Sequence, residues 1–245
     1  MPDQATFLRG LAKLYPDDAN SPWYIFVGLV LQANDRMDAI AALFEILREQ
    51  TPNREDLITK VRTLREAQLK ASVLIGFPKG INGCIALRNA VQKTAPELLT
   101  VLDKDPSLRE NLSRQEKDSR GLAFFQRIYS QHTDRVLENM SLASGGDLSQ
   151  FAINAVYGDL MAEERRLGAK ETGLLEFLAC YAAGGSSWSQ AKGHMFGSRN
   201  LGNSAEEIRG ALNICDAIED HFQIHVNRQP AANWTWLSKL DAWDH

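Results

Sequence analysis

The sequence lacks several features that mark whole classes of protein. Its 245 residues contain three cysteines, Cys84, Cys180 and Cys215, with no Cys-x-x-C pair or other metal-ligand spacing. No apolar run approaches the ~20 residues that span a bilayer, and the N-terminal segment has no signal-peptide pattern. The formal charge of −4, with acids and bases intermixed, does not favour a nucleic-acid partner. We therefore expect reduced thiols, no metal and no membrane span, in a cytoplasmic protein, with mitochondrial or peroxisomal residence left open.

Strand signatures are also missing, whereas signals that begin and end helices are frequent. Ser21-Pro22 predicts a helix that reaches about Gln32, and apolar residues at helical spacing predict another over 53–75. The segment 76–80, with two glycines and a proline, should end that helix before the next one begins at Ile81. Ser204 and Glu207 form a capping box for a helix over 205–223. The predicted fold class is all-α.

A polar, proline-containing stretch divides the chain into two helical halves. We assign residues 1–94 to an N-terminal helical repeat, 95–119 to a linker, 120–226 to a second helical repeat, and 227–245 to a tail that carries Trp234, Trp236 and Trp243. The second half is expected to open with one helix over 120–140, and Asp147 with Gln150 should cap a helix that reaches about Met161. The two repeats should pack as one globular unit.

The most informative stretch, residues 170–210, predicts two antiparallel helices around Gly184-Gly185 and a capped third helix. His194 lies midway along the second of these helices, and most of its neighbours three and four residues away are small, which favours burial of the imidazole. Glu171, in the preceding helix, is the candidate carboxylate partner. A histidine held in the core by a hydrogen bond and an acid–base catalyst are the two interpretations.

This stretch resembles the core of the carboxymuconolactone decarboxylase family, which is related to alkyl hydroperoxidase D. The matching residues are Lys170-Glu171, Gly184-Gly185, His194, Gly197 to Gly202 and Glu206-Glu207-Ile208, and Tyr157-Gly158 resembles the end of the family's entry helix. In the first half, Arg65-Glu66 parallels Lys170-Glu171, and residues 74–90 look like a signature of fungal members with a degenerate first repeat. The resemblance implies an alkyl hydroperoxidase D-like helical array with a degenerate internal repeat, assembled as trimers or hexamers.

The chain departs from the hydroperoxidases at their redox cysteines. The positions that would carry the Cys-x-x-C pair before His194 are Ser187 and Gln190, neither of which forms a thiolate. The first repeat has no histidine between Glu66 and Thr94, which leaves one candidate site per chain. A thiol peroxidase is therefore the least favoured of three functional hypotheses.

The first hypothesis is a decarboxylase-type lyase that needs no cofactor and acts on a small carboxylated lactone or related acid. In that hypothesis, His194 and Glu171 are catalytic, and the substrate-binding candidates are Lys170, Lys192, Tyr157 and Gln190. The second is a non-catalytic, oligomeric interaction protein, in which the Trp-rich tail anchors a partner rather than covering its own core. Ser238-Lys239-Leu240 spells a peroxisomal address, but one that is read at the extreme C-terminus, so we interpret it as a chance match.

Overall fold

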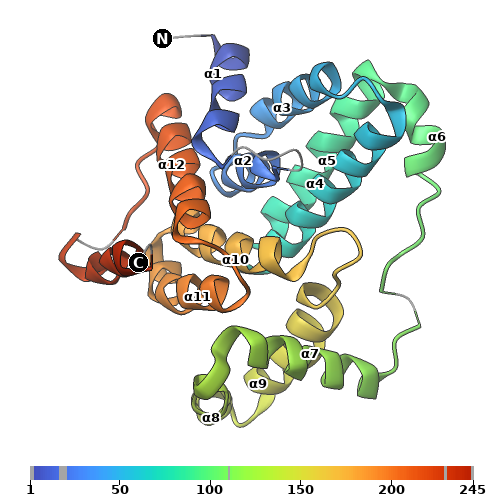
Figure 1. Ribbon diagram of the computed structural model, residues 1–245. Coiled ribbons are helices and arrows are strands. Elements are labelled where there is room, and N and C mark those ends of the chain that lie inside the picture. The colour runs from blue at the N-terminus through green and yellow to red at the C-terminus, as the bar shows by residue number, and fades with distance from the viewer. Residues whose placement is uncertain (1–2, 17–20, 110, 229–230, 244–245) are drawn as a thin grey trace.

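The computed structural model describes residues 3–16, 21–109, 111–228 and 231–243, and of residues 231–234 only the backbone. The described residues form helices and turns and contain no strand, which confirms the all-α prediction. The principal helices are shown in Figure 1: α1 (Gln4–Leu11), α2 (Trp23–Ala33), α3 (Met37–Gln50), α4 (Arg54–Ile75), α5 (Phe77–Thr94), α6 (Leu99–Leu102), α7 (Arg114–Tyr129), α8 (Thr133–Ser144), α9 (Asp147–Phe151), the π-helix η4 (Ala152–Met161), α10 (Ala169–Ala183), α11 (Trp188–Asn200), α12 (Ala205–Phe222) and α13 (Lys239–Ala242).

The main hydrophobic core joins the two ends of the chain. Helices α1 to α5 contribute to it together with α10, α11, α12 and the tail, and α2 is buried along its whole length at the centre. A second, smaller core lies between α7 and η4, around Phe124, Phe125, Tyr157 and Met161. In Figure 1 the helices α7, α8 and α9 accordingly lie together below the main body. No helix in the described residues has the length and apolarity needed to cross a membrane.

Several predicted boundaries are correct and others are wrong for local reasons. The helices α4, α10 and α11 match the predicted ranges closely, and the Ser204–Glu207 capping box is present. The predicted helix over 120–140 is two helices, because the backbone breaks at Ser130, whose φ is +47°. The predicted linker is helical at Leu99–Leu102 and again from Arg114. Asp147 lies inside α9 and is not its cap, since Gly146 occupies the N-cap position.

A single residue separates α4 from α5. Gly76 has a φ of +107°, and α5 begins at Phe77, with Pro78 in its first turn, so the predicted start at Ile81 is too late. Gly184, with a φ of +57°, separates α10 from α11 in the same way, except that one short turn follows it. Gln68 in α4 and Glu176 in α10 each lie eight residues before these glycines, and both are buried. The two helical hairpins therefore share the spacing between a buried polar residue and a glycine of positive φ.

The described part of the tail folds back on the chain itself. Trp236 and Leu240 belong to the main core, and Trp236 meets Phe177 of α10 edge-on. Trp243 packs against Phe196 of α11. The side chain of Trp234 lies outside the described residues. Two of the three tail tryptophans thus pack against other parts of the same chain, as expected if the tail covers the chain's own core.

Lys70 connects the two halves of the chain. Its side chain is fully buried, and its ammonium group donates to the carbonyl oxygens of Met161 (3.0 Å) and Glu163 (2.7 Å). The carbonyl of Leu167 (3.3 Å) and the hydroxyl of Thr172 (2.8 Å) complete a shell of four oxygen atoms. Burial lowers the pKa of Lys70 to about 8. The ammonium group thereby fixes the turn that leads from η4 into α10.

Replacing this ammonium group should destabilise the whole chain. Lys70→Met leaves three buried carbonyl groups and one hydroxyl short of a donor, so we expect the free energy of unfolding to fall by about 3 kcal/mol or more. Lys93→Met, at an exposed position of α5, is the matched control and should change it by less than about 0.5 kcal/mol. Urea unfolding monitored by circular dichroism measures the free energy of unfolding of both variants. Equal effects of the two substitutions would contradict the stabilising role of the Lys70 ammonium group.

Candidate functional site

The structure pairs His194 with a carboxylate from the neighbouring helix of the hairpin. His194 is on α11, and its Nδ1 lies 3.8 Å from Oε2 of Glu176 on α10. The side chains are 7% and 1% exposed, respectively, so both groups are withdrawn from solvent. This distance is longer than a hydrogen bond. The pair is therefore close enough to interact electrostatically, but no hydrogen bond joins its members.

Small residues allow α11 to approach its neighbours closely enough to bury the imidazole. Gly197 lies against Ile128 of α7, where a Cβ atom would be 2.5 Å from the Ile128 side chain. Gly173 of α10 similarly lies against Ser198 and Leu201. The sequence-based expectation that small neighbours bury His194 is confirmed.

Two tyrosines extend the pair into a polar cluster. Tyr129, at the end of α7, meets the His194 ring edge-on with 6.3 Å between ring centroids. Tyr157, on η4, lies beside it, and both tyrosine rings pack against the ring of Phe125. Burial first, and then the charge of Glu176, raise the pKa values of both phenols well above their usual value. Both hydroxyls are therefore protonated donors at neutral pH.

A close crossing of two backbones positions Tyr157. A Cβ atom on Gly158 would lie 2.3 Å from the carbonyl oxygen of Lys117, and one on Gly121 would lie 2.0 Å from that of Ile153, so only glycine fits at either position. The helix η4 has π geometry, which is frequent at functional sites. Packing thus explains why Tyr157 and Gly158 are adjacent in the sequence. The glycine allows η4 to pack closely on α7, and the tyrosine then faces the polar cluster.

Four polar atoms of this cluster lack a hydrogen-bond partner among the described residues. They are both carboxylate oxygens of Glu176, Nδ1 of His194 and the hydroxyl of Ser198, one turn after His194. A buried polar group without a partner costs ~1–3 kcal/mol, and more when it is charged. Such a concentration of unpaired groups requires an explanation, and groups that bind a reacting molecule provide one.

Cys180 lies one turn after Glu176 on α10. Burial, and next the charge of Glu176, raise the pKa of this thiol to about 12. The reactive form of a cysteine is the thiolate. Cys180 is therefore a protonated, unreactive thiol at neutral pH, which adds to the argument against a thiol peroxidase.

The structure brings together only some of the predicted site residues. Glu171 lies in the first turn of α10, about 7.5 Å along the helix from Glu176, and its charge acts on Tyr24 of α2. The carboxylate beside His194 is therefore Glu176, which corrects the expected Glu171 pairing. Lys170 forms an ion pair with Glu207, with a distance of 2.6 Å between Nζ and Oε1. Lys192 and Gln190 are exposed on α11, whereas Tyr157 is buried and close enough to Glu176 to feel its charge.

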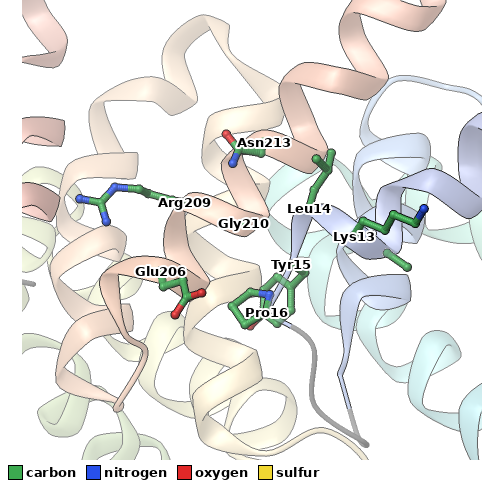
Figure 2. Close-up of a pocket in the computed structure, with 9 residues that line it drawn as sticks. Lys13, Leu14, Tyr15, Pro16, Glu206, Arg209, Gly210 and Asn213 are labelled. Carbon is green, nitrogen blue, oxygen red and sulfur yellow. The ribbon is translucent and has the colours of Figure 1, made fainter.

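Two clefts in the described residues lie away from this cluster. One of about 760 Å³ lies between residues 12–16 and α12, and Figure 2 shows Glu206 and Arg209 on one side of it and Lys13 on the other. Another, of about 820 Å³, lies between residues 106–112 and 162–165. Neither cleft is lined by His194 or Glu176, which are enclosed between the helices.

Cys215, Asp216 and Glu219 form the one group in the described residues whose ligand atoms lie close enough together to hold a metal ion. Arg228 already occupies this group, because its guanidinium donates to both oxygens of Glu219, at 2.8 and 2.6 Å. The same guanidinium lies over the ring of Tyr181, 3.9 Å from the centroid. The group therefore has a structural role, in which an arginine joins the segment after α12 to α10.

The residues that the structure describes form an all-α fold with a buried carboxylate–histidine cluster. No protein-family model matches the sequence, and no solved structure matches it. Two curated relatives do, and each is called "Peroxisomal protein 2". The Schizosaccharomyces pombe protein is 30% identical over 152 residues, which is 62% of this chain and 66% of the relative, just under two thirds of its length. The Saccharomyces cerevisiae protein is 26% identical over 211 residues, covering 71% of this chain and 72% of the relative.

The cost of burying Glu176 can be measured. Because neither carboxylate oxygen has a protein partner, Glu176→Gln should raise the free energy of unfolding by about 1–2 kcal/mol, as expected when a group kept for function is removed. Glu171→Gln is the control, and it should change that free energy by less than about 0.5 kcal/mol. Urea unfolding at neutral pH measures the free energy of unfolding of both variants and of the wild-type protein. A loss of stability on Glu176→Gln would show that the carboxylate is structural.

Proposed function

We propose that this chain belongs to the carboxymuconolactone decarboxylase-like group and carries one proton-transfer site. Support comes from the order of elements in its second half: α10, a glycine turn, α11 with His194, and α12 opened by a capping box. In the hairpin α4–α5, counted from its glycine, Gln68 has the position that Glu176 has in α10. Counted in the same way, Ala86 has the position of His194. One working site per chain follows from that difference.

The proposed reaction is the cofactor-independent decarboxylation of a small carboxylated lactone or a related acid. The bond between carbon and the carboxylate breaks, carbon dioxide leaves, and the electron pair stays on the substrate carbon. His194 donates a proton to that carbon and is reprotonated from solvent. Glu176 stabilises the protonated imidazole, and the hydroxyl groups of Tyr129 and Tyr157 supply donors beside it.

The observation that carries this proposal is the set of unpaired polar atoms on Glu176, His194 and Ser198. A histidine that only filled the core would have its ring nitrogens and its neighbours hydrogen-bonded to protein groups or to ordered water. Here the two members of the pair face each other at 3.8 Å without satisfying one another. Both side chains are almost fully buried, so the proposed reaction requires the helices around them to open a path for the substrate.

Deuterium incorporation tests the proposal even before the exact substrate is identified. Purified protein is incubated in D2O with carboxymuconolactone and a panel of related lactone acids, and carbon-bound deuterium and carbon dioxide are followed by NMR and mass spectrometry. We expect turnover that falls about 10²–10⁴-fold in His194→Ala and in Glu176→Gln. His132→Ala, at an exposed histidine between α7 and α8, is the control and should retain full activity.

Absence of both exchange and decarboxylation across the panel, in folded wild-type protein, would overturn the proposed chemistry. Activity that survives in His194→Ala would place the reaction elsewhere. Circular dichroism spectra and unfolding curves of each variant separate a lost reaction from a lost fold.

A second candidate function, that of an oligomeric interaction protein, is favoured by an apolar stripe on α5. Phe77, Ile81 and Ile85 recur every four residues, so they share one face of the helix, and they are 63%, 45% and 52% exposed, respectively. Exposed apolar groups of this kind mark contact surfaces. The occupant that we propose is a second copy of this chain, in keeping with the trimers or hexamers that the family resemblance implies.

Charges placed in the stripe should dissociate such an assembly. For the double variant Ile81→Glu and Ile85→Glu, sedimentation velocity should give the mass of a single chain, because two buried carboxylates at a contact are not compensated. Lys93→Glu, on an exposed position of the same helix outside the stripe, should leave the mass unchanged. A wild-type protein that sediments as a monomer at all concentrations would contradict the self-association.

We propose peroxisomal residence as the compartment, on the basis of the names of the two relatives. The tripeptide Ser238-Lys239-Leu240 does not support this proposal, because Leu240 is buried in the main core within α13. The localisation therefore depends on the relatives alone.

A further inference from the structure

An arginine-rich cleft lies on the face of the molecule that carries the degenerate first repeat. It has a volume of about 370 Å³ and lies between α4, Cys84 of α5 and residues 105–109. These residues belong to the connection from α6 to α7, in which Asp105 and Arg109 form ion pairs with α4. The charged lining of the cleft consists of Arg62, Arg65, Arg109, Arg166, Glu66 and Asp105. Four positive and two negative groups give the cleft an excess of positive charge.

The two carboxylates are fully engaged by three of the arginines. Asp105 accepts hydrogen bonds from Arg62, with 2.9 Å from Nε to Oδ2, and from Arg65, with 2.6 Å from Nη2 to Oδ2. These guanidinium groups lower the pKa of Asp105 against the opposing effect of burial. Glu66 is paired with Arg109 in a two-pronged contact. Both carboxylates are therefore already paired with guanidinium groups.

Two arginines of the cleft keep donors that have no acceptor among the described residues. The guanidinium of Arg166 makes no hydrogen bond or ion pair with any described group, although it is only partly exposed and lines the cleft. The Nε–H of Arg109 is buried and has no acceptor. A guanidinium fork recognises carboxylate and phosphate oxygens in two-pronged geometry. The guanidinium of Arg166 thus gives the cleft an unpaired donor group of the type that binds oxyanions.

We propose that this cleft binds a small organic oxyanion, a carboxylate or a phosphate ester, through Arg166 with the support of Arg65 and Arg109. The walls formed by Leu69, Pro106 and Leu108 accommodate the hydrocarbon part of the ligand. The proposal does not depend on the Glu176–His194 cluster, because none of these residues lines both sites. In this proposal the degenerate first repeat contains a binding site, whereas the corresponding hairpin in the second half contains the proposed reaction site.

Cys84 provides a reporter inside the cleft. It lines the cavity and is partly exposed, whereas Cys180 and Cys215 are buried. A ligand held by Arg166 should shield Cys84 from an alkylating reagent without affecting the other two thiols. Protection of this one thiol distinguishes binding in the cleft from binding of anions elsewhere on the surface.

The test titrates the full-length protein with inorganic phosphate and, separately, with succinate at constant ionic strength. Isothermal titration calorimetry follows affinity, and mass spectrometry follows N-ethylmaleimide modification of Cys84. We expect saturable binding of at least one probe with slower alkylation of Cys84. Arg166→Gln should weaken that binding at least tenfold, whereas Arg135→Gln, an exposed arginine of α8 with the same change of charge, should alter it less than twofold.

Binding of phosphate alone assigns a phosphate ester, and binding of succinate alone assigns a carboxylate. The proposal is overturned if neither probe binds, if both arginine variants weaken binding equally, or if binding leaves the alkylation of Cys84 unchanged. Unfolding curves of Arg166→Gln and Arg135→Gln establish that both variants are folded.

Discussion

The ammonium group of Lys70, enclosed by four oxygen atoms, determines how the two halves of the chain meet. It reaches from α4 to the carbonyl groups that end η4 and to Thr172 in the first turns of α10. These carbonyls lie at the end of a helix or in a turn, where no backbone donor is available to them. A buried cation in this position satisfies several acceptors at once. The start of α10, and with it the register of Glu176, consequently depends on a residue of the first half.

From that anchor the geometry of the polar cluster follows in order. The helix α10 carries Glu176 inward, and the glycine turn after it returns the chain as α11 with His194 facing α10. The crossing of Gly158 and Gly121 brings η4 against α7, so that Tyr157 and Tyr129 cover the pair. Each step is a close approach of backbones that requires small residues. The result is a carboxylate and an imidazole enclosed without full hydrogen bonding, which is a cost to stability that a reaction can explain.

Local signals in the sequence were sufficient for the helices and for burial of His194, but not for its partner. The capping box at Ser204 and the spacing in α4 are read from neighbouring residues, which is why both predictions are correct. Glu176 lies in a helix that is buried on nearly every side, so its apolar pattern does not reveal which face meets α11. A glutamate inside the run LLEFLACYA was the available signal, since an acid among so many apolar residues needs a reason to be buried.

Lys70 and the break at Ser130 were missed for a related reason. A lysine in an amphipathic helix is usually solvated, and the four acceptors of Lys70 come from residues about ninety to a hundred positions away, between residues 161 and 172. At Ser130 a non-glycine residue adopts a positive φ, which no residue preference predicts. The arginine-rich cleft likewise depends on contacts between α4 and the connection after α6. Contacts between distant segments, rather than local propensity, decided each of these features.

A high-resolution crystal structure of the protein tests the central claim most directly, because it shows what lies between Glu176 and His194. The account predicts an ordered water molecule or a bound carboxylate within hydrogen-bonding distance of the Glu176 carboxylate and Nδ1 of His194, and close to the hydroxyl of Ser198. It is contradicted if the carboxylate bonds the imidazole directly and every polar atom of the cluster finds a protein partner. In that case His194 is a core residue and the pair carries no chemistry.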